Sequence, residues 1–439
     1  MATPAITPAA GAASAASNKR RFIAHITRDQ GPEFEQSLVM SNTTSVTTAT
    51  SLRTDRKITV VQLHCKGRLT IGAGAPVTFQ NGPALLTPGP PGTTNTGANI
   101  FRLIQQFDIR GQHARYGALT PILMRGESQA EWWALFHPNY IPFWKIAING
   151  GTPVPYGPWS GAENATNDFE FTLPIPLYPL SINPSEQAFY ALHGPDWPGN
   201  LFVDVTFADA TALGVALSGL ANGGAITAYG SAAGNGTCDI LTERPLVGKD
   251  MAANIRPAIT FRTSVFQQPT SVVQAGGAAG SDLADLIVGK DTTRILLKTG
   301  TQLSSTSAGV VAFATYSDQI VTNTFFSLDS RGLRFQGANR DLCLQDYMSR
   351  SSNRYVAAGY KVIDFMQNRY FGGGNPKATL PSSKYTAARK LQLNGDTASA
   401  SNQIAEVTQE LLFGRSGLNK AAGVPTTASA TSATTGSGS

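Results

Sequence analysis

The sequence predicts an all-β protein built from two β-sandwich domains in tandem. Three observations support this: apolar and polar residues alternate over many short segments, glycine- and proline-rich stretches separate these segments, and a chain of 439 residues exceeds what one core usually accommodates. A period of two places the apolar side chains on one face of a strand, where they pack against a core. A propeller would show a repeat of about 40–50 residues, and the sequence shows none.

The clearest strand is expected at residues 58–71 (ITVVQLHCKGRLTI). One face carries the apolar residues Val61, Leu63, Cys65, Leu69 and Ile71, and the other carries His64, Lys66, Arg68 and Thr70. Residues 169–173 (FEFTL) and 201–207 (LFVDVTF) alternate in the same way. Further strands are expected at residues 34–46, 100–109, 259–265, 294–299, 310–316, 324–328, 360–365, 389–393 and 407–413. Short strands separated by long loops favour sandwiches or jelly rolls.

One segment of the second half breaks the β pattern. Residues 341–358 (DLCLQDYMSRSSNRYVAA) repeat apolar and aromatic residues at helical spacing. Asn339 is available as an N-terminal cap and Gly359 as a stop signal. We therefore expect a helix inserted between two strands of the second sandwich.

The ends of the chain differ from its body. Residues 1–17 and 421–439 contain no charged side chain and consist largely of Ala, Ser, Thr, Gly and Pro. Such segments bury too little apolar surface to offset the entropy of ordering, so we expect flexible arms. The join at 246–257 (LVGKDMAANIRP) separates two strand-rich halves. The predicted parts are an N-terminal arm (1–30), a first sandwich (31–248), a second sandwich (257–415) and a flexible C-terminal arm (416–439).

Charged residues are scarce, at 14% of the chain against a usual figure of about 25%. Either copies of the chain cover much of its surface, or uncharged polar residues solvate it. The net charge of +6 is too small to indicate nucleic-acid binding. Basic residues cluster at Lys19, Arg20 and Arg21 and between positions 331 and 390, where 11 basic residues stand against 3 acidic ones. Solvated faces, ion pairs between subunits, or contact with anionic lipid or nucleic acid would each explain these clusters.

Aromatic residues are dense at 131–145 (EWWALFHPNYIPFWK). The segment contains Trp132, Trp133 and Trp144. It is either a local core beneath a long loop or an aromatic contact between subunits, because aromatic residues are enriched at interface cores. We retain the three tryptophans as candidates for a subunit interface.

We find no motif for catalysis, a cofactor or a metal. Neighbours on a strand point to opposite faces, so His64 and Cys65 cannot form a base–nucleophile pair, and we expect Cys65 in the core. Three widely spaced cysteines suggest neither a disulfide framework nor a zinc motif. Paired carboxylates for glycoside hydrolysis have no local signature and stay open. No apolar run of about 20 residues predicts a membrane span, and no secretory signal is recognised. We expect a protein that is not an enzyme and needs no cofactor.

In the order of these features the chain resembles the double jelly-roll major capsid proteins of tailless, membrane-containing bacterial viruses of the tectivirus type. The resemblance is one of layout over about residues 30–415. The segments that support it are the opening strand at 34–46, IFRLIQQFD at 100–108, LFVDVTF at 201–207, CDIL at 238–241, the paired strands at 294–299 and 310–316, the helix at 341–355 and GYKVIDF at 359–365.

This resemblance implies two jelly rolls standing perpendicular to an icosahedral shell, with a helix inserted in the second. It implies a homotrimer of pseudo-hexagonal outline, contacts between trimers, and further partners among vertex or minor capsid proteins and an internal lipid membrane. Sequence-specific nucleic-acid binding is not expected. The protein would lie in the virion after assembly in the host cytoplasm. The N-terminal arm would face the membrane, where Lys19, Arg20 and Arg21 would each gain about 1 kcal/mol near anionic headgroups.

Two other classes remain open at this point. One is a single-jelly-roll coat protein of a small RNA virus with a protruding domain, although three basic residues in the first 21 are few for an arm that packs a genome. The other is a secreted β-sandwich protein that binds or cleaves carbohydrate.

Overall fold

A computed structural model of the chain describes twenty segments. They are residues 29–40, 47–71, 77–80, 100–136, 158–161, 166–179, 190–198, 201–209, 212–213, 226–229, 236–245, 258–267, 281–286, 290–302, 313–316, 323–327, 337–338, 360–364, 389–394 and 403–413. They are mostly strands, which confirms the predicted all-β class.

The first half folds as a jelly roll. Its main strands are β1 (Asp29–Val39), β2 (Thr47–Ser51), β4 (Val60–Ile71), β6 (Ile104–His113), β7 (Gly117–Met124), β9 (Thr166–Pro176), β11 (Leu201–Phe207) and β13 (Thr237–Pro245). They lie side by side in the orders β1-β13-β4-β9 and β2-β11-β6-β7. Numbered 1 to 8 along the chain, these rows read 1-8-3-6 and 2-7-4-5, the alternation between two sheets that defines a jelly roll.

The second half repeats this order. Its strands are β14 (Ile259–Gln267), β15 (Ser281–Leu286), β16 (Asp291–Gln302), β18 (Asn323–Ser327), β19 (Gly337–Ala338), β20 (Tyr360–Asp364), β21 (Arg389–Asn394) and β22 (Gln403–Phe413). They form the rows β14-β22-β16-β20 and β15-β21-β18-β19, again 1-8-3-6 and 2-7-4-5. The second half is therefore a second jelly roll.

Shorter elements complete the two jelly rolls. In the first, β3 (Lys57–Ile58) pairs with β10 (Leu192–His193), β5 (Val77–Gln80) with β8 (Pro158–Gly161), and β12 (Ile226–Tyr229) with β4. In the second, β17 (Phe313–Tyr316) pairs with the end of β16. The helices in the part of the chain that the structure describes are η2 (Ile100–Leu103), α2 (Gly126–Phe136) and η4 (Gly194–Asp196). None of the helices within the described segments is long and apolar enough to cross a bilayer.

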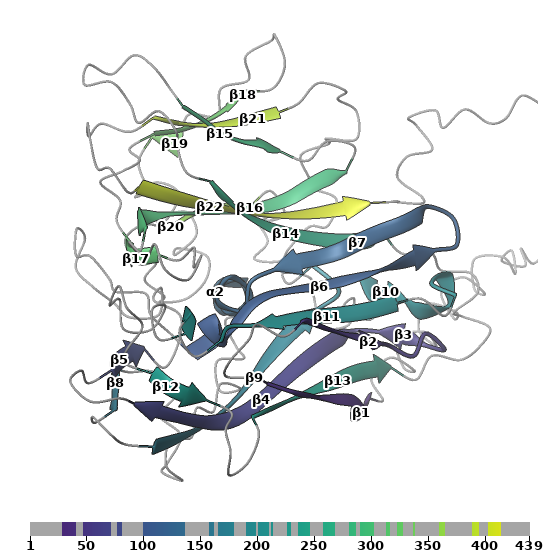
Figure 1. Ribbon diagram of the computed structural model, residues 1–439. Coiled ribbons are helices and arrows are strands. Elements are labelled where there is room, and N and C mark those ends of the chain that lie inside the picture. The colour runs from purple at the N-terminus through teal and green to yellow at the C-terminus, as the bar shows by residue number, and fades with distance from the viewer. Residues whose placement is uncertain are drawn as a thin grey trace, which may run out of the picture.

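The two jelly rolls share a sheet. β14 runs parallel to β7, with Arg262 opposite Ile122 and Thr263 opposite Leu123. This pairing joins one sheet of each half into a nine-stranded sheet. In Figure 1 the shared sheet lies between the β1-β13-β4-β9 row at the bottom and the β15-β21-β18-β19 row at the top. The predicted boundary at 246–257 lies outside the described residues, between β13 and β14.

An aromatic contact joins the halves at the turn between β6 and β7. The Tyr116 ring lies 4.7 Å from that of Phe413 on β22, and Phe413 packs in turn against Phe261 on β14 at 5.9 Å. His113 contacts Tyr116 at 4.8 Å and Trp197 at 5.1 Å, both between ring centroids. Such pairs each contribute roughly 0.5–1.5 kcal/mol beyond the area they bury. They hold the edge of the second jelly roll against the first.

The core of the first jelly roll follows the predicted alternation. Along β11, every second residue from Leu201 to Phe207 is fully buried and those between are half-buried. Cys65 on β4 is buried opposite Cys238 on β13, as expected of a core residue. Burial and the neighbouring Cys238 thiol raise the pKa of Cys65 well above its ordinary value, so the Cys65 sulfur behaves as an apolar core atom.

Two predicted strands have other boundaries. Residues 100–109 begin as the 3-10 helix η2, whose four residues are all buried, and the strand starts only at Ile104. This helical turn directs Arg102 inward, where it bonds to Glu127. The strand expected at 34–46 begins earlier, at Asp29, and ends at Val39; residues 41–46 lie outside the described part.

The sequence did not reveal α2. It occupies the connection between the fifth and sixth strands of the first jelly roll. The helix predicted at 341–358 falls in the equivalent connection of the second jelly roll, between β19 and β20, and lies outside the described residues.

Candidate functional site, a charged seam between the jelly rolls

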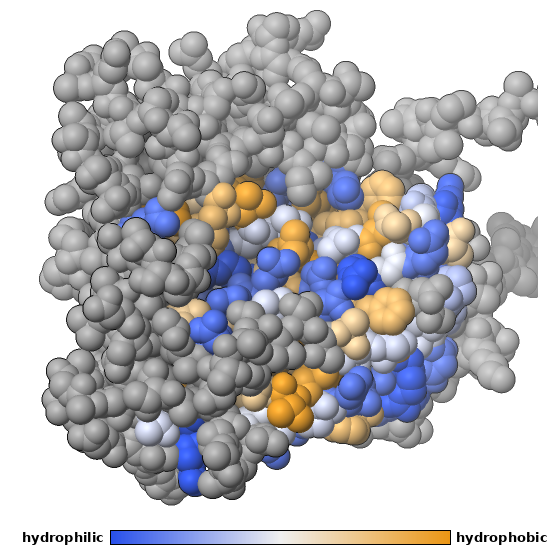
Figure 2. Space-filling view, in the orientation of Figure 1, coloured by the Kyte–Doolittle hydropathy of each residue, from blue (hydrophilic) through white to orange (hydrophobic). Residues whose placement is uncertain are grey.

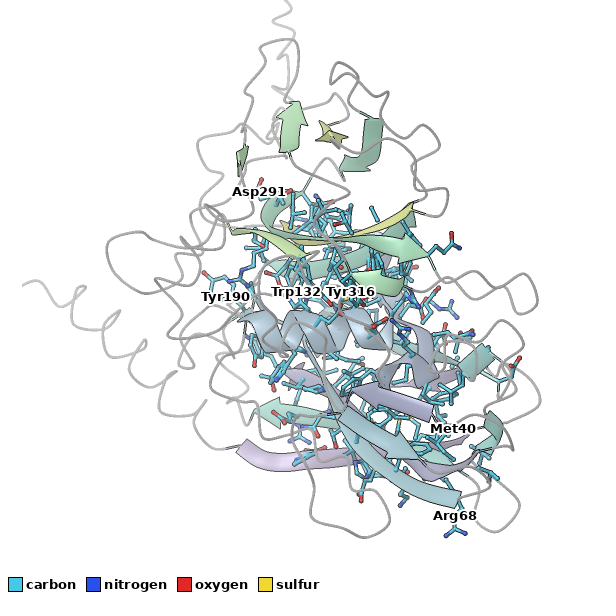
Figure 3. All side chains as sticks on the ribbon, turned by 90° about the vertical axis from the view of Figure 1, so that its left-hand side faces the viewer. Met40, Arg68, Trp132, Tyr190, Asp291 and Tyr316 are labelled. Atoms are coloured by element: carbon cyan, nitrogen blue, oxygen red, sulfur yellow. The ribbon has the colours of Figure 1, made fainter. Side chains whose placement is uncertain are left out.

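α2 is enclosed between the two jelly rolls. It packs on η2, β6 and β9 of the first half, and its polar side chains bond to strands of the second. Figure 3 shows Trp132 and Tyr316 in the layer between α2 and the sheet of the second jelly roll. We call this layer the seam; it consists of Arg102, Glu127, Ser128, Gln129, Glu131, Arg262, Ser264, Arg294, Lys298, Tyr316, Tyr360, Glu406 and Glu410.

The strands that face α2 carry charges at buried positions. On β16 and β22, Lys298 lies directly opposite Glu406, and Arg294 opposite Glu410. All four side chains are fully or almost fully buried. The alternation of a strand is kept, but the face towards α2 is ionic rather than apolar.

Lys298 lies at the centre of the seam. Its Nζ is 2.6 Å from Glu131 Oε2 on α2 and 2.5 Å from Glu406 Oε2 on β22, and it donates to Ser128 Oγ at 3.1 Å. The hydroxyls of Ser128 and Ser264 both donate to Glu406. One ammonium group therefore joins a helix of the first jelly roll to two strands of the second.

The α2 carboxylates accept several further hydrogen bonds. The Tyr360 hydroxyl donates to Glu131 Oε1 at 2.6 Å, and the Tyr316 hydroxyl lies 2.9 Å from Glu127 Oε1 and 3.3 Å from Glu131 Oε1. Arg102 Nε donates to both oxygens of Glu127 at 3.1 Å, and its Nη2 reaches the backbone carbonyl of Phe313 at 3.0 Å.

A second cluster surrounds Glu410. Its carboxylate accepts from Arg262 Nη2 at 3.0 Å, Arg294 Nη1 at 3.3 Å and Thr293 Oγ1 at 2.9 Å. Arg262 Nη1 also donates, at 3.3 Å each, to Gln129 Oε1 on α2 and to the Pro176 carbonyl at the end of β9. Arg262 thus connects both jelly rolls through three acceptors.

At the ionisable groups around Lys298, burial and the neighbouring charges have opposing effects on the pKa. Burial, with the nearby carboxylates of Glu127 and Glu406, raises the pKa of Glu131 to about 7, although Lys298 opposes the shift. Burial alone would lower the pKa of Lys298, but the surrounding carboxylates outweigh it and the pKa is raised. Burial likewise opposes ionisation of Glu406, yet Lys298 and Arg125 hold its pKa below the ordinary value.

These charges join the two jelly rolls across the seam. A buried ion pair adds little net stability over apolar packing, but loss of one partner is costly, so the pairs fix how the two surfaces meet. Within the described residues, no group of three or more His, Cys, Asp or Glu side chains is placed to hold a metal ion.

The predicted interface residues divide between the described and undescribed parts. Trp132 and Trp133 lie on α2 and are buried inside the subunit, and the Trp132 ring is 5.6 Å from the Arg262 guanidinium carbon. Their position is that of a local core, the alternative left open above, and a role in a subunit contact stays a prediction. Lys19, Arg20, Arg21 and Trp144 lie outside the described residues, as does nearly all of the basic stretch 331–390.

His64 and Cys65 point to opposite faces of β4, as predicted. The His64 ring lies on the outer face, 2.9 Å from Thr172 Oγ1 and 3.0 Å from a carboxylate oxygen of Glu170. Cys65 is fully buried on the other face. The two side chains therefore form no catalytic pair.

On the face shown in Figure 2, hydrophilic and hydrophobic side chains of the described residues lie side by side. The large apolar side chains that are exposed within the described segments are Phe34 and Val39 on β1 and Val265 on β14. Single exposed apolar residues are common on soluble proteins, so these three define no docking surface by themselves.

The sequence carries a weak signal for the seam. Residues 294–298 (RILLK) and 404–410 (IAEVTQE) place charged residues at alternate positions of apolar strands. An exposed face would produce the same pattern, and only the pairing of β16 with β22 beneath α2 distinguishes the two cases.

Comparison with known proteins places this arrangement in one structural class. No protein-family model matches the chain, and no curated protein matches it. Solved structures do. The STIV major capsid protein is 12% identical, with 87% of this chain and 95% of that chain covered and a TM-score of 0.50.

The structure of Sulfolobus Turreted Icosahedral Virus gives 12% identity, coverage of 87% and 90%, and a TM-score of 0.51. The PBCV-1 virus capsid gives 11% identity, coverage of 87% and 94%, and a TM-score of 0.53. At such identities the likeness establishes the fold alone. The chain has the double jelly-roll fold.

Proposed function

We propose that this chain is a major capsid protein of an icosahedral virus, and that it acts in the virion shell as a structural subunit and not as an enzyme. Three copies form a trimer of pseudo-hexagonal outline, and trimers tile the shell around an internal membrane, as in the tectivirus type. The proposed partners are further copies of the chain, vertex or minor capsid proteins, and the membrane.

One observation carries the proposal: both halves repeat the strand order 1-8-3-6 and 2-7-4-5 and are joined through one sheet. Two similar jelly rolls in one chain give three copies six similar lobes, the number a hexagonal tile needs. The second half repeats the strand order of the first. This favours a double jelly roll over the small RNA-virus alternative, which has a single jelly roll and a protruding domain.

We expect the purified protein to be a trimer. Light scattering should give three times the 46.3 kDa mass of the chain, and negative-stain images should show a hexagonal outline. A stable monomer at all concentrations would contradict the proposal and lead to tests of glycan binding and hydrolysis.

The membrane-facing role of the N-terminal arm makes a separate prediction. Replacing Lys19, Arg20 and Arg21 together by alanine should weaken binding to anionic phosphatidylglycerol vesicles by roughly 100-fold or more, because each basic residue near a charged bilayer contributes about 1 kcal/mol. Co-sedimentation at physiological salt measures this, and the trimer mass should not change.

The matched control keeps the charges. A K19R/R20K/R21K variant should bind vesicles as the wild type does, and neither protein should bind uncharged phosphatidylcholine vesicles. Equal vesicle binding by the alanine and wild-type proteins would show that the arm does not face the membrane. Salt-dependent binding of RNA by the wild type alone would favour the nucleic-acid alternative.

A further inference from the structure

The seam is not evenly charged around Lys298. Three carboxylates, those of Glu127, Glu131 and Glu406, lie there with two cations that bond to them directly, Arg102 and Lys298. With Glu127 paired to Arg102, Glu131 and Glu406 therefore share the single ammonium of Lys298, and Arg125 acts on Glu406 in addition. Such a site favours binding of one proton, because buried like charges repel strongly in a medium of low polarisability.

The Glu131 carboxyl group lies close to charged and polar groups of both jelly rolls. From α2 itself it faces Glu127; the second jelly roll presents Lys298 from β16, Glu406 from β22, Tyr316 from β17 and Tyr360 from β20. Arg102 on η2 is engaged by Glu127. Arg125, at the start of α2, acts on Glu406 and stacks 4.2 Å from the centre of the Phe266 ring.

We propose that Glu131 makes the seam a pH-sensitive lock, which holds the two jelly rolls together more tightly in mildly acidic than in mildly alkaline solution. The inference rests on the contacts of the seam and not on the proposed capsid role. Protonation of Glu131 removes its repulsion with Glu127 and Glu406, while Lys298 keeps its ion pair with Glu406. Ionisation of Glu131 restores the repulsion between α2 and β22.

The direction of the effect follows from proton linkage. The pKa of Glu131 is about 7 in the folded chain, above its ordinary value of 4.5. Between these two values the folded state holds a proton that the unfolded state has released. Glu131 therefore favours folding fully below pH 4.5, and this contribution is lost as the pH rises through 7. Glu406, with a lowered pKa, contributes oppositely and only near and below its ordinary value.

Unfolding of the full-length protein in urea at pH 6 and pH 8, at one protomer concentration, tests the proposal. Other groups also titrate in this range: burial and Asp204 raise the pKa of Asp108 to about 6, and burial lowers that of Lys57 to about 8. The comparison is therefore with Glu131→Gln, which keeps an acceptor oxygen but cannot ionise. From pH 6 to 8 the wild-type unfolding constant should rise about tenfold more than that of the variant.

Two controls keep the test decisive. Glu243→Gln removes a half-buried carboxylate from β13, far from the seam, and should retain the wild-type difference between the two pH values. If Glu131→Gln does not fold, hydrogen exchange in the wild type replaces it: protection of α2 relative to β11 in the same sample should fall from pH 6 to 8. Equal pH dependence in wild type and Glu131→Gln, or a constant ratio of protection, would overturn the proposal.

Discussion

Replacing Lys298 by methionine should lower the free energy of unfolding by about 3–5 kcal/mol, because it removes the buried ammonium that Glu131 and Glu406 share. Lys298 is fully buried and is the only ammonium that the described residues place between Glu131 and Glu406. Methionine keeps the apolar length of the side chain, so the loss reports the charge and not a cavity. Urea denaturation of the purified protein at neutral pH measures it.

Two companion variants show whether burial is the cause. Lys66→Met removes an ammonium that is more than half exposed and 4.0 Å from Asp239, and it should cost at most about 1 kcal/mol. The triple variant K298M/E131Q/E406Q removes the charges together and should recover much of the lost stability, because apolar or neutral replacements of buried ion pairs are often tolerated. Equal losses for Lys298→Met and Lys66→Met would mean that the seam is hydrated and not closed.

The strands were the elements that could be predicted best from the sequence. The alternation at residues 201–207 matches β11 to the residue, and 259–265 lies within β14. The prediction worked there because one face of each strand meets an apolar core and the other meets solvent or polar neighbours. The resemblance in layout supplied the jelly-roll order, which alternation alone cannot specify, and the double jelly-roll class is confirmed.

α2 escaped prediction because its surroundings are polar. The helix reads GESQAEWWALF and has no apolar stripe in its first two turns. Glu127, Ser128, Gln129 and Glu131 are buried, but each faces a charged or hydroxyl partner from the other jelly roll. Periodicity detects an apolar face against an apolar core, and here the partner surface is ionic. No pattern within residues 126–136 themselves carries that information.

The parallel pairing of β7 with β14 could not be predicted from the sequence either. The two strands lie more than a hundred residues apart, and the contact uses only Ile122 and Leu123 against Arg262 and Thr263. Both strands would be edge strands of separate sandwiches without it, and edges of this kind need covering. The seam and this short ladder therefore depend on each other: the ladder aligns β14 with α2, and Arg262 on β14 bonds to Gln129.

Gly126→Ala should be the second most damaging change, with a loss of about 3 kcal/mol, the upper part of the range for overpacked cores. Gly126 begins α2 and lies against η2. A Cβ there would stand 2.4 Å from the backbone oxygen of Phe101 and 2.8 Å from Cβ of Ile104. Neither atom is the end of a flexible side chain, so η2 and α2 must separate, and Arg102 and Glu127 with them. Urea denaturation gives the total loss.

The location of the damage separates this effect from ordinary glycine strain. Gly117, in the turn between β6 and β7, has a positive φ of 76°, and a Cβ there would meet nothing closer than 3.9 Å. Gly117→Ala should therefore cost only about 1–2 kcal/mol of backbone strain and leave hydrogen exchange in α2 unchanged. Gly126→Ala should speed exchange throughout α2, since the helix loses its support on η2. If exchange in α2 is unaffected in Gly126→Ala, the helix is held by the charged seam alone, and its contact with η2 is dispensable.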